Sequence, residues 1–228
     1  MRFLSTIFLL LALPAFGQRL SSAGALAALS DTQAKQNVTS GLVGWWTFNN
    51  TTNDASGSSN NAALVNTFYT NGFPAAKGLY VATGKYASFG STNLTGLTNW
   101  TVAAWVNVNY VEYSGLVVFG NEGIVQTHLT RLGLLHGGNV VDCSVDWTPY
   151  VWTWTHVACT YTASATNCYI NGVLSNGSYS SDAGYGLAAN YVVGYGYNGT
   201  AVTGVIDDVR IYNRALSAGE ITTIYNYR

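Results

Sequence analysis

Hydrophobic and polar positions alternate with a period of two along much of the chain from Gly41 onward. Residues 101–108 place four apolar side chains on one face of a strand and polar side chains on the other. Residues 157–161 and 205–211 alternate in the same way, and Gly, Asn and Ser clusters such as Asn171–Gly172 separate the runs. Many short strands divided by turns predict an all-β sandwich or barrel.

One helix is indicated, near the end of the chain. Ser217 and Glu220 have the spacing of a capping box, in which each side chain binds the other residue's free backbone N–H. Leu216 and Ile221 stand at the positions of the accompanying hydrophobic staple. Together with Ile224, they predict a short C-terminal helix whose apolar stripe packs against the sandwich.

The first residues have the pattern of an export signal. A positive start precedes eleven mostly apolar residues, 3–13, which are too few for the ~20 that cross a membrane. We therefore expect a signal peptide over 1–17, a weakly helical linker over 18–40 and one sandwich domain over 41–228. No other segment reaches membrane-spanning length. The protein is expected to be secreted, extracellular or held at the cell surface.

Composition narrows the function classes. Charged residues make up 8% of the 228 residues, against roughly a quarter in ordinary soluble domains, and the net charge is -1. A chain without basic clusters has little with which to bind a phosphate backbone, so nucleic acid is not an expected partner. With 48% hydrophobic residues, the chain is also too apolar to stay disordered.

Five segments of the chain form an ordered set: an opening strand, a following loop and strand, a central strand, a hairpin and a closing strand. They are 41–49, 54–64, 101–106, 154–161 with 169–173, and 204–217. Together they resemble the laminin G-like, concanavalin A-like jelly-roll family. The resemblance implies two packed antiparallel sheets, found mostly outside the cell and used mostly to bind glycans or proteins.

Glucanases share this architecture, so an enzyme is a competing interpretation. Retaining glycosidases need two carboxylates about 5 Å apart. Glu112, Glu122 and Glu220 are isolated from one another, and Asp142 and Asp146 are the only acids placed at i and i+4 on one strand. Zinc-ligand spacing, a nucleophile elbow and a phosphate loop are also missing from the sequence. We therefore expect a protein that is not an enzyme.

Exposed aromatic side chains would suit a neutral sugar, as would a surface rich in Asn and Tyr. Trp147, Tyr150 and Trp152 fall in an expected loop beside Pro149 and are the candidate ligand-binding residues. The favoured function is binding of an extracellular glycan or polysaccharide without cleavage. An adhesion or structural role through contacts with other surface proteins is the alternative, and a glycoside hydrolase or lyase is the third.

Three cysteines leave an odd thiol after any pairing. A four-residue connection, 162–165, places Cys159 directly opposite Cys168 on two paired strands. The sequence therefore predicts a Cys159–Cys168 disulfide with Cys143 free. Cys143–Cys159 is the rival bridge, and the other alternative is that Cys159 and Cys168 are only small buried residues.

A structural calcium ion is a further expectation. By strict alternation, the Asp207 carboxylate shares a face with the apolar side chains Val205, Val209 and Ile211. Burying it uncompensated would cost several kcal/mol, and a hard cation with oxygen ligands is one solution. Related jelly rolls often bind calcium near their termini, which implies Asp54, in the matching early loop, as a second ligand. The alternative partners are nearby arginines, Arg210 and Arg214.

Overall fold

The structure is a computed structural model that describes residues 38–90, 94, 96–111, 114–126, 130–137, 139–175, 181–182, 190–195 and 201–226. Residues Ala34–Arg228 form one compact unit, which holds the whole described region. The expected signal peptide and most of the expected linker lie outside the described residues and stay predictions. None of the described helices is long and apolar enough to cross a membrane.

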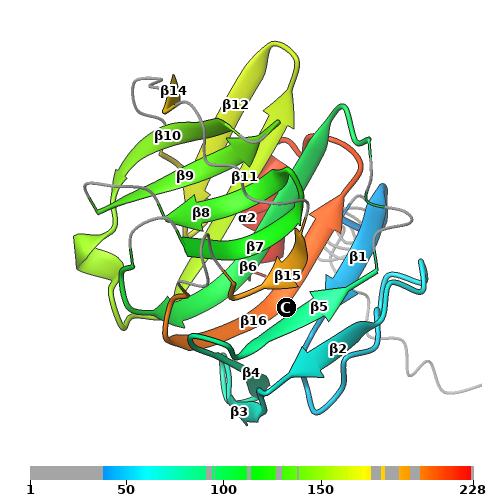
Figure 1. Ribbon diagram of the computed structural model, residues 1–228. Coiled ribbons are helices and arrows are strands. Elements are labelled where there is room, and N and C mark those ends of the chain that lie inside the picture. Colours follow the sequence, from blue (N-terminus) through cyan, green and yellow to red (C-terminus); the bar gives the residue numbers. More distant parts are fainter. Residues whose placement is uncertain are drawn as a thin grey trace, which may run out of the picture. The chain divides into compact units, whose positions relative to one another are not determined.

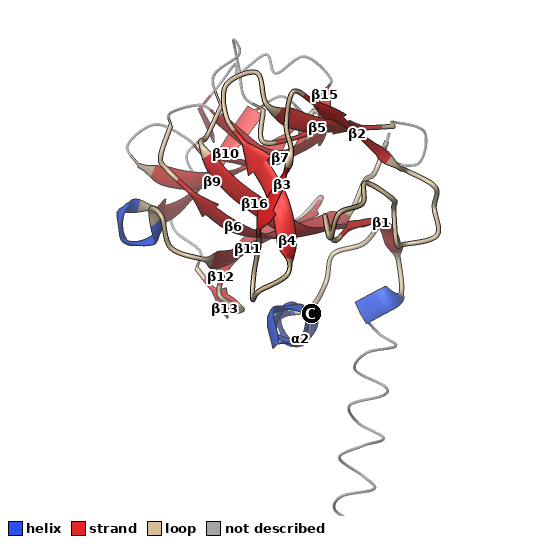
Figure 2. Ribbon diagram, turned by 90° about the horizontal axis from the view of Figure 1, so that it is seen from below, coloured by secondary structure: helices blue, strands red, loops and turns tan. Residues whose placement is uncertain are grey.

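Two antiparallel sheets pack face to face in this unit, as Figures 1 and 2 show, so the expected all-β sandwich is confirmed. Sheet A has the strand order β13-β12-β11-β6-β16-β4-β3, and β1 also pairs with β16. Its strands are β1 (Leu42–Trp46), β3 (Tyr69–Asn71), β4 (Lys77–Val81), β6 (Trp100–Val108), β11 (Thr155–Thr162), β12 (Ala165–Ile170), β13 (Val173–Leu174) and β16 (Gly204–Tyr212).

Sheet B has the strand order β14-β10-β9-β8-β7-β15-β5-β2. A short 3-10 helix, η1 (Thr148–Tyr150), follows β10. The strands of sheet B are β2 (Ala62–Val65), β5 (Tyr86–Phe89), β7 (Ser114–Gly120), β8 (Glu122–Gln126), β9 (Arg131–His136), β10 (Asn139–Asp146), β14 (Ser181–Asp182) and β15 (Asn190–Val193).

The core lies between the sheets and is filled by the inward side chains of both. The expected alternation of β6 holds, because its even-numbered residues from Val102 to Val108 face this core. The largest fully buried side chains of the core are aromatic: Trp46, Phe48, Trp100, Phe119 and Trp147. Aromatic rings bury large apolar areas, so few of them suffice to hold the sheets together.

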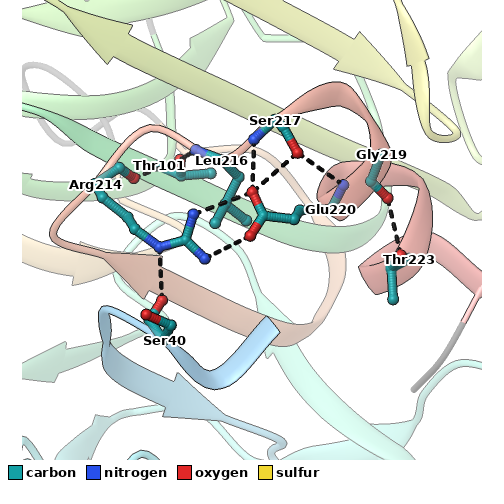
Figure 3. Close-up of polar contacts among 8 residues, drawn as sticks. All are labelled: Ser40, Thr101, Arg214, Leu216, Ser217, Gly219, Glu220 and Thr223. Atoms are coloured by element: carbon teal, nitrogen blue, oxygen red, sulfur yellow. Dashed lines mark hydrogen bonds and ion pairs between the residues drawn. The ribbon is translucent and has the colours of Figure 1, made fainter. Parts of the chain in front are cut away.

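The C-terminal helix α2 (Ala218–Asn226) begins with the expected capping box (Figure 3). The Glu220 carboxylate accepts from the Ser217 backbone N–H at 2.8 Å, and the Glu220 N–H donates to Ser217 Oγ at 3.3 Å. Arg214 adds a two-pronged ion pair to the same carboxylate, at 2.6 and 3.0 Å. Thr101, at the start of β6, anchors the segment by accepting from the Leu216 N–H.

Helix α2 covers the outer face of sheet A (Figure 2). Ile221 and Ile224 are fully buried against outward residues of that sheet, which include Ala103 and Ala158. Outward residues of sheet A are therefore buried as well, and sheet A has an inner and an outer apolar layer.

A β-bulge in β16 contradicts the expected face of Asp207. The register of β16 against β6 shifts between Asp207 and Arg210, and Asp208 has a left-handed φ of 46°. Before the bulge, Ile206 faces the core, whereas after it Val209 and Ile211 do. One inserted residue exchanges the two faces of the strand, so even-numbered residues face the core before the bulge and odd-numbered residues face it afterwards. Asp207 therefore lies opposite Trp105 on the outer layer rather than beside Val209 and Ile211.

The disulfide prediction is also wrong, although the register behind it is correct. Cys159 does lie directly opposite Cys168. The bridge, however, joins Cys143 to Cys168, with Cα atoms 5.9 Å apart, and Cys159 is a buried free thiol. Cys143 is on the inner face of sheet B and Cys168 on the inner face of sheet A. The spacing between packed sheets, which strand pairing does not reveal, brings these two together.

Candidate functional site

The predicted aromatic trio does not form an exposed platform. Trp147 is fully buried in the core, because it continues the inward alternation of β10 through Cys143 and Val145. Tyr150 is half-buried and packs beside it. Trp152 is exposed at 57%, and its backbone N–H donates to the Val108 carbonyl at the end of β6. One exposed aromatic ring remains from the three.

The opposite end of β6, which starts at Trp100, lies beside a cavity of about 270 Å³. Its walls come from the loop after β5, the β7–β8 turn and the start of β15. Apolar side chains form part of the lining, and an amide, a carboxylate and a phenol supply the polar groups. The lining residues are Leu94, Gly96, Leu97, Phe119, Gly120, Asn121, Glu122 and Tyr191.

The carboxylate of Glu122 is held in place from three sides. The indole Nε1 of Trp100 donates to Oε2 at 3.1 Å, and His136 Nδ1 lies 2.7 Å from the same oxygen. The Gly137 backbone N–H donates to Oε1 at 3.2 Å. Since a carboxylate offers about four lone-pair positions, one acceptor position on Oε1 is left beyond these contacts.

An aromatic stack fixes the partners of Glu122. The His136 ring lies on Tyr161 with centroids 3.7 Å apart, and Tyr161 stacks on Trp100 at 5.8 Å. These rings come from β9, β11 and β6, so both sheets hold the carboxylate. A rigid acceptor loses little conformational entropy when it binds a hydroxyl.

Burial shapes the electrostatics of the cavity. It raises the pKa of Glu122 above its ordinary value, while the hydrogen bonds from His136, Gly137 and Trp100 oppose that shift. Burial likewise raises the pKa of Tyr191, so its hydroxyl keeps its proton and can donate. Glu122 is the only charged residue among the lining residues that the structure describes. The cavity therefore offers a fixed carboxylate acceptor, a phenol donor and the Asn121 amide beside an apolar wall.

Sequence reasoning missed this site because it treated Glu122 as isolated. Phe119 pairs with Glu122 across a two-residue turn, Gly120–Asn121, and Gly120 has the left-handed φ of 64° that such turns require. A Gly-Asn pair between apolar runs is a hairpin signal that the sequence does carry. The approach of His136 from the next hairpin carries no such local signal.

The acids considered for catalysis do not form a site in the described residues. Asp146 is exposed and accepts from the Thr148 N–H at 2.9 Å, which lowers its pKa. A general acid needs a raised pKa, so this shift runs the wrong way for that role. The side chain of Asp142 lies outside what the structure describes.

Asp54, proposed as a calcium ligand, organises its own loop. Its Oδ1 accepts from the backbone N–H groups of Trp45 and Ser56, each at 2.9 Å, and its Oδ2 accepts from that of Asn60 at 3.0 Å. Three amides therefore compensate the carboxylate charge, as they would in a tight polar turn.

Asp207, the second proposed ligand, is fully buried and accepts from the backbone N–H groups of Phe73 at 3.0 Å and Asp208 at 2.7 Å. These two N–H groups compensate the negative charge of Asp207, which is the role that the sequence analysis gave to a cation. The charge of Asp54 is compensated by N–H groups of other segments. In the described part of the chain, the only group of three or more His, Cys, Asp or Glu side chains close enough to share a metal ion is made of cysteines. Calcium stays an untested prediction, which a fall in melting temperature on chelation would support.

The family follows from the sequence once this fold is known. The family model of the concanavalin A-like lectin/glucanases superfamily matches residues 81–222, which is more than half of the chain. The chain belongs to this superfamily. No curated protein sequence matches the chain.

Solved structures agree with this superfamily's fold. Domain 4 of AbnA, a GH43 extracellular arabinanase from Geobacillus stearothermophilus solved with arabinotriose, has a TM-score of 0.62 at 21% identity, covering 81% of this chain and 98% of that one. Trypanosoma rangeli sialidase has a TM-score of 0.60 at 16% identity, covering 89% of this chain and 38% of that one. The binding domain of Paraclostridial Mosquitocidal Protein 1 has a TM-score of 0.57 at 16% identity, covering 83% of this chain and 52% of that one. Identities this low show the fold alone.

Proposed function

We propose that this protein is a non-catalytic module that binds a neutral extracellular saccharide in the Glu122 cavity. The observation that carries the proposal is a rigid carboxylate beside an amide and a phenol, over an apolar wall. Vicinal sugar hydroxyls need such fixed acceptors and donors, while the apolar face of a sugar ring needs a hydrophobic wall.

The charge and size of the cavity limit the ligand. Among the described lining residues, Glu122 is the only charged one, so an anionic sugar would meet a charge of the same sign. A volume of about 270 Å³ is slightly below the roughly 300–1,000 Å³ typical of small-molecule sites. This size suits one sugar ring, such as the end or side branch of a polysaccharide.

The carboxylate count supports binding without cleavage. A glycosidase that uses two acids holds them about 5 Å apart for retention, or ~6.5–9.5 Å apart for inversion. Within the described part of the chain, Glu122 is the only carboxylate that lines the cavity. The complex of AbnA domain 4 with arabinotriose is consistent with a saccharide ligand on this fold, although at 21% identity it supports the proposal only by analogy.

The test measures binding of the full chain to soluble neutral and acidic polysaccharides by calorimetry, with an assay for released reducing ends. We expect neutral ligands to bind without release, and Glu122→Gln and Tyr191→Phe each to weaken binding about tenfold, which corresponds to one lost hydrogen bond of ~1.4 kcal/mol. Trp152→Ala, at the other end of β6, is the matched control and should bind normally. A loss confined to Trp152→Ala would move the site there, and no binding at all would refute the function.

The adhesion alternative has one observation in its favour. β13 is an edge strand of sheet A, and its Val173 and Leu174 are exposed at 68% and 52%. Exposed apolar edges are templates for pairing with another chain. If this edge binds protein, sedimentation of the wild type should show concentration-dependent association that Val173→Lys abolishes. A monomer at all concentrations would count against self-association.

A further inference from the structure

Three cysteine sulfurs meet in the core of the sandwich. Cys143 comes from β10 of sheet B, whereas Cys159 and Cys168 come from β11 and β12 of sheet A. Their Sγ atoms all lie within 4.8 Å of one another, and all three residues are buried. A disulfide uses only two of them, so the third sulfur stays beside the bond.

The sulfur outside the disulfide, that of Cys159, contacts the sulfur of Cys168, which takes part in both possible bridges. Cys143 and Cys168 form the disulfide, and Cys159 Sγ lies 3.3 Å from Cys168 Sγ. Cys159 is also the direct cross-strand partner of Cys168. A thiol in contact with one sulfur of a disulfide is the natural attacking group for thiol–disulfide exchange.

We propose that Cys168 exchanges disulfide partners between Cys143 and Cys159. The Cys159 thiolate attacks Cys168 Sγ and forms the Cys159–Cys168 bond, while the Cys143–Cys168 bond breaks. Cys143 leaves as a thiolate and takes up the proton that Cys159 released. Each side of the reaction holds one disulfide and one thiol, so the step needs no oxidant or reductant.

The two forms differ in what they hold together. The Cys143–Cys168 bridge joins sheet A to sheet B, whereas a Cys159–Cys168 bridge joins neighbouring strands of sheet A. Their loops span 25 and 9 residues, and the longer loop restrains the unfolded chain more. Exchange therefore releases the covalent link between the sheets, and the linked form is the more stable one.

Burial controls the rate of exchange. It raises the pKa of the Cys159 thiol, so little of the reactive thiolate exists in the closed core. Exchange should therefore be slow in the native protein at neutral pH, and it should accelerate at alkaline pH or when the sandwich opens transiently.

The experiment maps the disulfide before and after incubation at pH 9 in a low, non-denaturing concentration of urea. Maleimide is added to each sample only when it is taken, to block the free thiols before digestion. Chymotrypsin suits this chain, because aromatic residues at Trp147, Trp154 and Tyr161 separate the three cysteines into different peptides. We expect the wild type to begin as Cys143–Cys168 and to gain Cys159–Cys168 with time. In Cys143→Ser, the Cys159–Cys168 bridge should form quantitatively in a glutathione redox buffer.

Cys159→Ser is the matched control, since it keeps the inter-sheet bridge and cannot exchange. It should melt several degrees above Cys143→Ser when both are oxidised. Two free thiols in folded, oxidised Cys143→Ser, or a wild-type bridge unchanged after incubation, would overturn the proposal. Circular dichroism establishes that each variant is folded.

Discussion

Two carboxylates of this protein have almost the same partners but different surroundings. Asp208 accepts from the indole Nε1 of Trp45 at 2.6 Å and pairs with Arg210 through both oxygens, at 3.1 and 2.9 Å. Glu122 accepts from the indole Nε1 of Trp100 and lies against His136. Each is thus bound by a tryptophan and a basic side chain.

Exposure separates the two sites. The side chains of Asp208 and Arg210 are 3% and 6% exposed, whereas those of Glu122 and His136 are 17% and 36% exposed. The Asp208 pair, with Arg210 stacked over the Trp45 ring at 4.8 Å, is enclosed and can serve only the fold. Glu122 borders a cavity, so the same chemistry is available to a ligand. Hydrogen bonding alone does not distinguish a structural carboxylate from a functional one.

Asp208→Asn tests the enclosed site and should have the largest effect. It leaves the Arg210 guanidinium buried without its counter-charge, which costs about 3–5 kcal/mol of unfolding free energy. Glu122→Gln should cost less, because its carboxylate is partly hydrated. Urea unfolding measures both, and equal losses in the two variants would contradict the comparison. Adding Arg210→Met to Asp208→Asn should recover part of the loss.

His156, on the same outer layer, should make stability depend on pH. Burial lowers the pKa of His156 to about 3, even though nearby Asp208 opposes the shift. The unfolded chain takes up this proton below pH ~6.5 while the native state stays neutral, so the unfolding free energy falls by about 1.4 kcal/mol per unit as pH drops from 6.5 toward 3. His156→Gln should flatten this slope in urea titrations between pH 7 and 4. Identical slopes would show that His156 does not carry the effect.

Glu220 provides a third, more exposed carboxylate for the comparison (Figure 3). It caps helix α2 and pairs with Arg214 at 2.6 Å. Glu220→Gln should cost about 1 kcal/mol, the usual worth of a helix cap with a partly exposed ion pair. Thermal unfolding measures this loss, and high salt should reduce the difference from wild type. A loss of unfolding free energy as large as that of Asp208→Asn would mean that the exposure of a carboxylate does not determine how much it contributes to stability.

Trp152→Ala should have the smallest effect on stability. Its side chain is 57% exposed, and exposed substitutions usually change the unfolding free energy by less than about 0.5 kcal/mol. Trp147→Ala, five residues earlier, removes a fully buried ring and should cost about 3–5 kcal/mol. Similar melting temperatures for the two variants would refute the division of this aromatic cluster into core and surface.

Local patterns in the sequence determined much of the fold. The period of two in β6 and β11, the short connection that sets Cys159 opposite Cys168, and the Ser217–Glu220 capping box all came out as expected. These features depend on residues that are neighbours in the chain or in one hairpin. Their geometry follows from backbone periodicity and turn length, which the sequence displays directly.

Packing between distant segments decided the rest. The bulge at Asp208 changed which residues of β16 face the core. The spacing of the two sheets paired Cys168 with Cys143 rather than with Cys159. The Glu122 site needed three strands and two sheets to bring its partners together. Such contacts depend on the distance and twist between layers, which no local period encodes. The sequence alone determined the class of fold, and the tertiary structure decided which carboxylate faces a cavity.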